Sequence, residues 1–98
     1  MNNDIFYDKS RLSILAVLIA QKSEITFNEL IEKTQLTKGN LSSHLKKLED
    51  EKVIKINKFF DEKKPVTTIQ LTAAGRKSFL DYLSQMENLI KKSLKKNV

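Results

Sequence analysis

Apolar residues recur at helical spacing near the start of the chain. Between Arg11 and Gln21 they form a wide band, so this segment is predicted to be a core helix, with Ser10 as a possible N-cap. The helical period is then interrupted, and Thr26 is followed three residues later by Glu29. These two side chains form a capping-box pattern, which predicts a second helix from about Phe27 to Thr34.

A third helix is predicted from about Lys38 to Glu51, with Thr37 as its N-cap. Leu41, Leu45 and Leu48 recur at spacings of four and three, so they share one side of this helix. The opposite side and its flanks carry small, polar and cationic residues. The residues of this helix and its cap that can face a ligand are Thr37, Lys38, Gly39, Asn40, Ser42, Ser43, His44, Lys46 and Lys47.

A β-hairpin is predicted after the third helix. Residues 53–60 (VIKINKFF) alternate in part between apolar and polar, residues 65–71 (PVTTIQL) are rich in β-branched side chains, and the polar run DEKK separates them. Pro65 has no N–H for a ladder, so it is expected at the first residue of the second strand or on an edge. Phe59 and Phe60 are adjacent and should point to opposite faces, so one of them should be more exposed or pack under the hairpin.

The last segment is predicted to be a long helix from Ala73 to about Lys92, capped by Thr72 and followed by a frayed basic tail over residues 93–98. Its apolar residues exceed what one face of a small core can cover, which favours pairing with a second copy of the chain. Packing on the first helix alone is the alternative. The predicted dimer contacts are Phe79, Leu80, Leu83, Met86, Leu89 and Ile90.

The order of these elements predicts the fold. Two short helices joined by a turn of about three residues, followed by a hairpin with a basic tip, are typical of a winged helix-turn-helix. We therefore expect a mainly α (α+β) fold, with a three-helix core, a β-hairpin wing and a long C-terminal dimerisation helix. A chain of 98 residues suits one hydrophobic core, so a single domain is predicted over residues 1–98, with its core at about 9–72.

The composition argues against several classes of site. There is no cysteine and His44 is the only histidine, so neither a disulfide nor a conventional zinc or transition-metal site is expected. No cofactor is predicted. No apolar run approaches the roughly 20 residues of a membrane span, and the first residues do not resemble a signal peptide. We therefore expect no membrane contact and a cytoplasmic location.

The formal net charge is +6, and part of the basic excess lies in the third helix and the hairpin. An excess of this kind suits a polyanion, because lysines neutralise phosphates and release condensed counterions. A lysine-rich surface kept for solubility is the alternative, and a charged hairpin tip could also protect a strand edge from pairing. The hairpin lysines that could reach phosphates are Lys55, Lys58, Lys63 and Lys64.

The third helix has the features of a DNA-recognition helix. Its short Ser and Asn side chains would let it approach base edges in the major groove, which is roughly 12 Å wide, and Asn40 is the preferred base reader. The acidic run from Glu49 to Glu51 would repel phosphate, so only the first two or three turns are expected to enter the groove. An ordinary solvated helix is the alternative. His44 is expected to pack beside the second helix or to contact a phosphate rather than to catalyse a reaction.

Several of these segments resemble the minimal winged helix DNA-binding domain family, which is related to the MarR and ArsR regulators. The matching segments are RLSILAVLI (11–19), FNEL (27–30), LTKGNLSSHLKKLE (36–49), KFF (58–60) and KKPVTTIQLTAAGR (63–76). The resemblance implies a homodimer held together by the terminal helices, with residues 38–40, residues 42–44, Lys63 and Lys64 facing DNA.

One position departs from that family. Lys52 stands where the family usually has glycine after the third helix. Either the turn into the wing is less tight, or Lys52 adopts a left-handed conformation at a cost of about 1 kcal/mol.

These features favour a homodimeric transcriptional regulator, most simply a repressor, that binds double-stranded DNA sequence-specifically. A winged helix that binds another protein is the alternative from a different class. An enzyme is not expected, because no phosphate loop, nucleophile constellation or carboxylate pair is recognisable. Any small-molecule effector, of unknown kind, should bind at the dimer interface or between the terminal helices and the core, since the chain has no room for a separate sensing domain.

Overall fold

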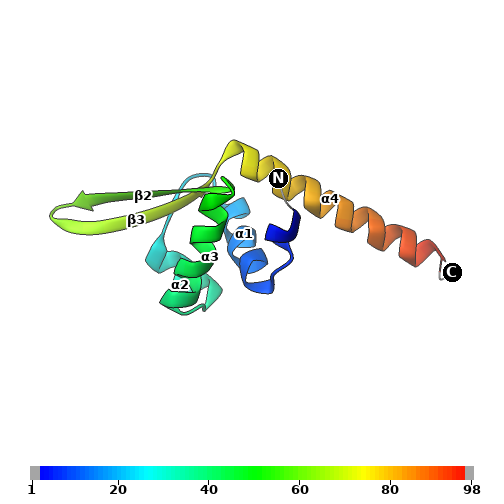
Figure 1. The fold of residues 1–98 in the computed structure, drawn as a ribbon, viewed down its shortest axis with the longest axis horizontal. Coiled ribbons are helices and arrows are strands. Elements are labelled where there is room, and N and C mark those ends of the chain that lie inside the picture. The colour runs from blue at the N-terminus through cyan, green and yellow to red at the C-terminus, as the bar shows by residue number, and fades with distance from the viewer. Residues whose placement is uncertain (1–2, 97–98) are drawn as a thin grey trace.

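The computed structural model describes residues 3–96, which form a helical body with two extensions (Figure 1). The hairpin projects from one end of the body and the last helix from the other, so the molecule measures 61 × 25 × 22 Å. The elements in chain order are the 3₁₀ helix η1 (Asn3–Phe6), α1 (Lys9–Ala20), β1 (Ile25–Thr26), α2 (Phe27–Thr34), α3 (Lys38–Asp50), β2 (Ile54–Asp61), β3 (Lys64–Leu71) and α4 (Ala73–Lys96). The predicted winged helix-turn-helix, with its hairpin wing and long C-terminal helix, is confirmed.

Side-chain caps fix the starts of α2 and α3. Thr26 Oγ1 accepts a hydrogen bond from the Glu29 N–H at 3.1 Å, and the Glu29 carboxylate accepts from the Thr26 N–H at 3.4 Å, which confirms the capping box. At the start of α3, Thr37 Oγ1 accepts from the Asn40 N–H at 3.2 Å. Between these helices Gln35 closes α2 in the left-handed conformation, with φ of 60°. The tight turn of residues 35–37 therefore sets the direction in which α3 leaves α2.

The first helix begins two residues earlier than predicted. Its N-cap is Asp8, whose carboxylate accepts a hydrogen bond from the Arg11 N–H at 2.9 Å. Ser10 therefore lies inside the first turn, and the expectation that it caps the helix is wrong. The first turn precedes the apolar band, so hydrophobic periodicity does not reveal where the helix starts.

The hydrophobic core extends to residues ahead of α1. Phe6 is fully buried, and its ring centroid lies 5.6 Å from that of Phe79 and 5.2 Å from that of Tyr82. The core thus begins in η1, before the predicted boundary at residue 9. Phe79 is 2% exposed inside this aromatic cluster. It is therefore a core residue of the protomer, which leaves little of its side chain for the predicted contact with a second copy.

The wing belongs to a three-stranded antiparallel sheet in the order β1-β3-β2. The sequence pattern did not reveal β1, because two residues are too short to show alternation. Ile25 and Thr26 pair with Ile69 and Thr68, so β1 covers only the base of the hairpin. Pro65 is the second residue of β3, not the first, and it pairs with Phe60 on a stretch of β3 that β1 does not reach. Pro65 therefore lies at an edge of the sheet, which was the alternative prediction.

The root of the wing is a Schellman motif at the end of α3. The Val53 N–H donates to Leu48 O and the Lys52 N–H donates to Glu49 O, both at 2.9 Å. Lys52 has φ of 61°, so the left-handed alternative predicted for this position is confirmed.

The start of α4 is locked to this root. Gly75 N–H donates to Thr72 Oγ1 at 2.9 Å, which confirms the predicted cap, and the Thr72 N–H donates to Val53 O at 3.0 Å. A Cβ on Gly75 would overlap the carbonyl of Val53. Arg76, one residue later, donates from Nη2 to Gln21 O at 3.2 Å at the end of α1. These contacts fix the direction in which α4 leaves the body.

The last helix is longer than predicted. It continues to Lys96, four residues beyond the expected end, so residues 93–96 are helical rather than frayed, while residues 97–98 lie outside the described residues. Its C-terminal half projects clear of the body (Figure 1). Within residues 3–96, no helix is long and apolar enough to cross a membrane.

Candidate nucleic-acid interface

The outward side of α3 is open to solvent. Leu41, Leu45 and Leu48 are at most 2% exposed and hold the helix against the body, as predicted. Apart from His44, every residue predicted to face a ligand from α3 and its cap is exposed. These residues are Thr37, Lys38, Gly39, Asn40, Ser42, Ser43, Lys46 and Lys47.

Gly39 adds no side chain to the exposed surface of the first turn of α3. A Cβ built on this residue meets no atom within 4 Å among the described residues, so the packing of the protomer does not require glycine here. Ser42 and Ser43 continue the small surface into the next turn. The free amides at a helix N-terminus attract anions, so this end of α3 suits close approach of a phosphate backbone.

The polar partners of His44 are Asp8 and Arg11 at the start of α1, whereas the sequence predicted a place beside the second helix or a phosphate contact. Its Nδ1 lies 3.3 Å from Nη1 of Arg11, and its Nε2 lies 3.9 Å from Oδ1 of Asp8. Arg11 also donates from Nε to Ile5 O at 2.7 Å. With 19% of its side chain exposed, His44 is a packing residue at the margin of the outward face.

Asp8 carries the negative charge of this cluster. The hydrogen bond from the Arg11 N–H lowers the pKa of Asp8, and the nearby charges of Arg11 and His44 act in the same direction against the opposing effect of burial. The carboxylate therefore stays ionised as it caps α1. Neither Asp8 nor Arg11 was indicated as a neighbour of α3, because they lie more than 30 positions away in the sequence.

The wing presents alternate residues to α3 and away from it. Ile56 and Lys58 border the hollow beside α3 together with Thr67 of β3. Because successive strand residues point to opposite faces, Lys55 and Phe59 lie on the other face of the hairpin. Of the two predicted lysines on β2, only Lys58 is therefore brought beside α3.

The tip of the wing is a two-residue turn between Asp61 and Lys64. Its central residues, Glu62 and Lys63, have φ of 49° and 68°. Two left-handed residues are the mark of a type I′ turn, which normally uses Asn and Gly. Lys63 and Lys64 are exposed there beside two acidic side chains, so the tip carries mixed charge.

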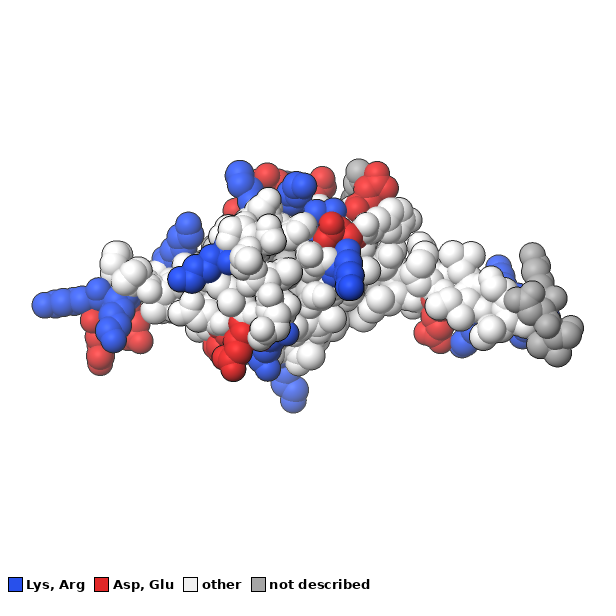
Figure 2. Space-filling view, turned by 90° about the horizontal axis from the view of Figure 1, so that it is seen from below, with Lys and Arg blue, Asp and Glu red and all other residues white. Residues whose placement is uncertain are grey.

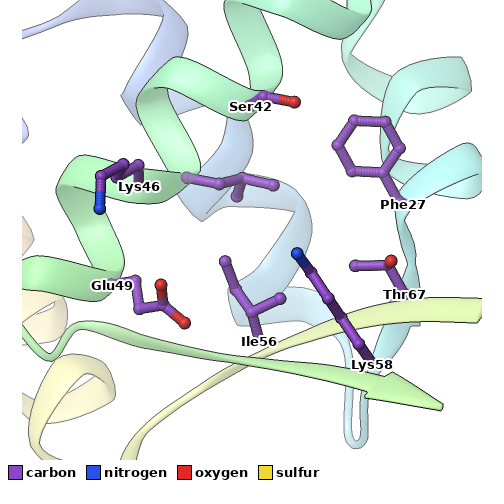
Figure 3. Close-up of a pocket in the computed structure, with 8 residues that line it drawn as sticks. Phe27, Ser42, Lys46, Glu49, Ile56, Lys58 and Thr67 are labelled. Atoms are coloured by element: carbon purple, nitrogen blue, oxygen red, sulfur yellow. The ribbon is translucent and has the colours of Figure 1, made fainter.

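A hollow of about 450 Å³ separates α3 from the wing (Figure 3). Ser42, Lys46 and Glu49 border it on α3, and the ammonium group of Lys58 is directed into it from β2. Phe27 closes the side nearest α2. The residues that border this hollow thus join the exposed side of α3 to the α3-facing side of the wing.

Charge is distributed unevenly around this surface. In Figure 2, Lys and Arg side chains together with several Asp and Glu side chains lie around a largely uncharged centre, and mixed charge also lies at the far tip of the hairpin. Glu49, Asp50 and Glu51 are exposed at the end of α3, where Asp50 lies 3.7 Å from the ammonium of Lys46. The N-terminal turns of α3 are free of acidic residues, so the two ends of the helix differ in their suitability for phosphate.

The projecting part of α4 carries an uncovered apolar stripe. Leu83 is 41% exposed, Ile90 60% and Leu94 62%, and at about 100° per residue all three lie on one side of the helix. Met86 adjoins this stripe and is half-buried against the core. Leu80 and Leu89 are also exposed, but they flank the stripe. Leu94 was not predicted, although its spacing of four from Ile90 is a signal in the sequence.

Among residues 3–96, no group of three or more His, Cys, Asp or Glu side chains could hold a metal ion. The described surface instead carries small, polar and cationic groups at one end of the body and an apolar stripe at the other.

Comparison with known proteins gives a consistent picture. The family model of the winged helix DNA-binding domain matches residues 10–90. An uncharacterized protein from Methanocaldococcus jannaschii is 38% identical over 87 residues, which are 89% of this chain and 94% of that protein.

Solved structures share the fold. A transcriptional regulator homologue from Pyrococcus horikoshii has a TM-score of 0.85 and 27% identity, with 94% of this chain and 90% of that chain covered. A protein assigned to the MarR family of transcriptional regulators, from Enterococcus faecalis, has a TM-score of 0.76 and 20% identity, with 97% and 84% covered. At that identity the second similarity establishes the fold alone.

Proposed function

The chain belongs to the winged helix DNA-binding domain family, and on that premise we propose that it is a transcriptional regulator that binds double-stranded DNA as a homodimer. The observation that carries the proposal is the outward side of α3. It is exposed over its first turns, free of acidic residues there, and bordered by Lys58 of the wing.

In this proposal the N-terminal turns of α3 enter the major groove. Asn40 is the candidate base reader, because an Asn side chain can form two hydrogen bonds with the edge of adenine. Gly39, Ser42 and Ser43 allow the backbone of the helix to come close. Lys38, Lys46 and Lys47 contact phosphates, and the acidic end of α3 stays outside the groove.

The wing contacts the flanking backbone. Lys58 is directed from β2 toward α3, so it can reach a phosphate at the edge of the same groove. Lys63 extends from the turn toward the next phosphates, with Lys64 beside it at the very end of the hairpin, where it pairs with Asp61. Lys55 lies on the far face of the hairpin and is expected to contribute less to binding.

Pairing of two copies uses the stripe on α4. A helix of 24 residues is about 36 Å long, and its projecting half carries Leu83, Ile90 and Leu94 on one side. Burial of this stripe against a second copy removes apolar surface that the protomer leaves in water. A two-fold arrangement with the α3 helices about 34 Å apart would fit successive major grooves on one side of a duplex. If the bound site overlaps a promoter, the dimer would block access to it and act as a repressor.

The test is a measurement of duplex affinity against salt. In vitro selection from random duplexes would first supply a bound sequence, which is expected to be a pseudo-palindrome. Affinity should then fall as salt rises, and each phosphate contacted should make the slope of log affinity against log salt more negative by about 0.9. A flat salt dependence would contradict the proposal.

Charge reversal provides the matched comparison. A variant with Lys38, Lys46, Lys47, Lys63 and Lys64 changed to Glu should lose DNA binding, whereas Lys55→Glu should retain most of it. A protein-interaction module would instead retain its cellular function when those five lysines are reversed, and that result would overturn the proposal.

A further inference from the structure

The tip of the wing carries an apolar pair that the proposed function leaves unused. Phe60 is 76% exposed, more than the other exposed large apolar side chains of the described chain, which range up to 62%. It pairs across the hairpin with Pro65, which is also exposed. Single exposed apolar residues are common, so exposure alone carries no weight. What distinguishes Phe60 is its position relative to α3.

Phe60 shares a face of the hairpin with the residues that border the hollow beside α3. Strand residues two apart point to the same side, so Ile56, Lys58 and Phe60 follow one another along the side of β2 that faces α3. Their partners on β3 continue this face. A duplex seated on α3 would therefore meet Lys58 first and Phe60 about 7 Å farther out along the strand.

The charges near the tip favour a polyanion on this face. Lys58 lies on it, whereas Lys64 pairs with Asp61 and Lys63 lies in the turn. By strand alternation Asp61 and Lys64 both point to the opposite face, and the turn carries one residue of each charge, Glu62 and Lys63. The α3-facing side of the wing strands beyond Ile56 thus has a cation and an apolar pair but no acidic residue.

The tip is also held at a fixed length. A two-residue turn leaves no slack between the strands, and its two left-handed residues set the register that places Phe60 opposite Pro65. Proline adds a ring of fixed backbone angle behind the phenyl group. The hairpin therefore presents a rigid apolar edge rather than a flexible loop.

We infer that Phe60 is a wedge for the minor groove, next to the major groove that receives α3. The minor groove is about 6 Å wide, and Phe and Pro are among the residues that proteins insert there to unstack a base step. Unstacking is easiest at flexible pyrimidine–purine steps, so Phe60 would add a preference for TA or CA at a position that α3 does not read. This inference rests on the proposed function.

The experiment uses the full chain and the duplex selected by the wild-type protein. 2-Aminopurine, placed in turn at each position flanking the α3 contact, reports unstacking through a rise in its fluorescence. Three variants are compared with wild type: Phe60→Ala, Phe60→Leu and the matched control Phe59→Ala, which alters the opposite face of the same strand.

Wild type should raise the fluorescence at one flanking position in each half-site. Phe60→Ala should abolish that rise and weaken binding at least about fivefold, with an unchanged salt slope because no charge is lost. Phe60→Leu should retain most of both effects, and Phe59→Ala should bind within about twofold of wild type. Selection repeated with Phe60→Ala should lose any enrichment of pyrimidine–purine steps.

The outcomes separate this inference from the proposed function. If wild type binds duplex DNA with a steep salt dependence but Phe60→Ala behaves as wild type does, the wedge is refuted and DNA binding stands. Equal losses in Phe59→Ala and Phe60→Ala would also refute it, because they would indicate damage to the wing as a whole. So would a loss that sedimentation traces to altered self-association. Absence of duplex binding by wild type would overturn both.

Discussion

Arg11 Nη1 lies 3.3 Å from Nδ1 of His44 and so joins the first turn of α1 to the middle of the proposed recognition helix. Arg11 Nε donates at 2.7 Å to Ile5 O in η1. The residue after Ile5, Phe6, is packed against Phe79 of α4. One guanidinium thus links α3 to the segment on which the base of α4 rests.

Replacement of Arg11 by Met should therefore destabilise the protein although it retains much of the apolar stem. The change removes the donor to the Ile5 carbonyl, and the loss of such a hydrogen bond costs about 1–3 kcal/mol. Urea unfolding gives the free-energy difference. Lys9→Met is the control, since Lys9 is exposed on the same turn, and an equal loss in that variant would contradict the assigned role.

Asp8 should make stability depend on acid pH. Its pKa is lowered in the folded protein, chiefly by the hydrogen bond from the Arg11 N–H, so its carboxylate stabilises the fold above the ordinary aspartate pKa. That contribution should disappear as the pH falls below about 4 and through the lowered pKa. Asp8→Ala should cost about 1 kcal/mol at pH 7 through loss of the cap and should flatten this dependence.

Asp8→Asn separates the cap from the charge. Asparagine is an equally good N-cap, so this variant should retain most of the stability at pH 7 but lose the acid dependence below pH 4. Thermal unfolding at a series of pH values measures both effects. A pH profile of Asp8→Asn parallel to that of wild type would show that the carboxylate is not the responsible group.

Lys52→Gly should stabilise the protein. Lys52 occupies the left-handed position of the Schellman motif, with φ of 61°, and glycine avoids a cost of about 1 kcal/mol for an L-residue there. Denaturant unfolding should show a higher midpoint with an unchanged m value. Lys55→Gly on β2 is the contrasting variant and should destabilise, because glycine weakens a strand interior.

The helix-turn-helix and its core were predictable because their signals are local. Thr26 and Glu29 form a capping box within four residues, and Leu41, Leu45 and Leu48 repeat at helical spacing, so neither feature depends on distant partners. The left-handed conformation of Lys52 could also be predicted, because the family that the sequence resembles usually has glycine at this position.

Features formed by distant segments could not be read in the same way. Phe79 has the spacing of an exposed stripe on α4, and only the fold brings Phe6 of η1 over it. The partners of His44 lie on α1 for the same reason. The end of α4 was placed too early because lysines at residues 91, 92, 95 and 96 dilute the apolar pattern, although they are compatible with an exposed helix.

The two glycines of the chain should respond in opposite ways to alanine. Gly75→Ala would force a methyl group into the Val53 carbonyl, so it should destabilise the protein by about 1–3 kcal/mol or more and disturb the joint between α4 and the wing. At Gly39 the added methyl group meets open space, so Gly39→Ala should leave stability unchanged or raise it by up to about 1 kcal/mol.

The affinity of Gly39→Ala for duplex DNA should be measured as well as its stability. If the first turn of α3 lies against base edges, the methyl group should weaken duplex binding although the fold is no less stable. Circular dichroism melts and fluorescence anisotropy with the selected duplex give the two quantities. Undiminished affinity would indicate that α3 does not approach the groove at this residue.

Ile90→Glu should separate the two copies of the proposed dimer. Ile90 lies at the centre of the exposed stripe of α4, between Leu83 and Leu94, so a carboxylate there would be buried without a partner in the paired state. Because Ile90 is 60% exposed within the protomer, the fold of each copy should be unaffected. Gln85→Glu is the control, since it adds the same charge on the opposite side of the exposed helix.

Sedimentation and duplex titration together decide this prediction. Ile90→Glu should sediment as a monomer with an unchanged melting profile and should bind a single half-site about as well as wild type. On the complete palindrome it should lose the gain that comes from two linked recognition helices, typically about 10²-fold or more. Gln85→Glu should remain a dimer with full affinity. If Ile90→Glu also stays dimeric, the stripe on α4 is not the surface through which the copies pair.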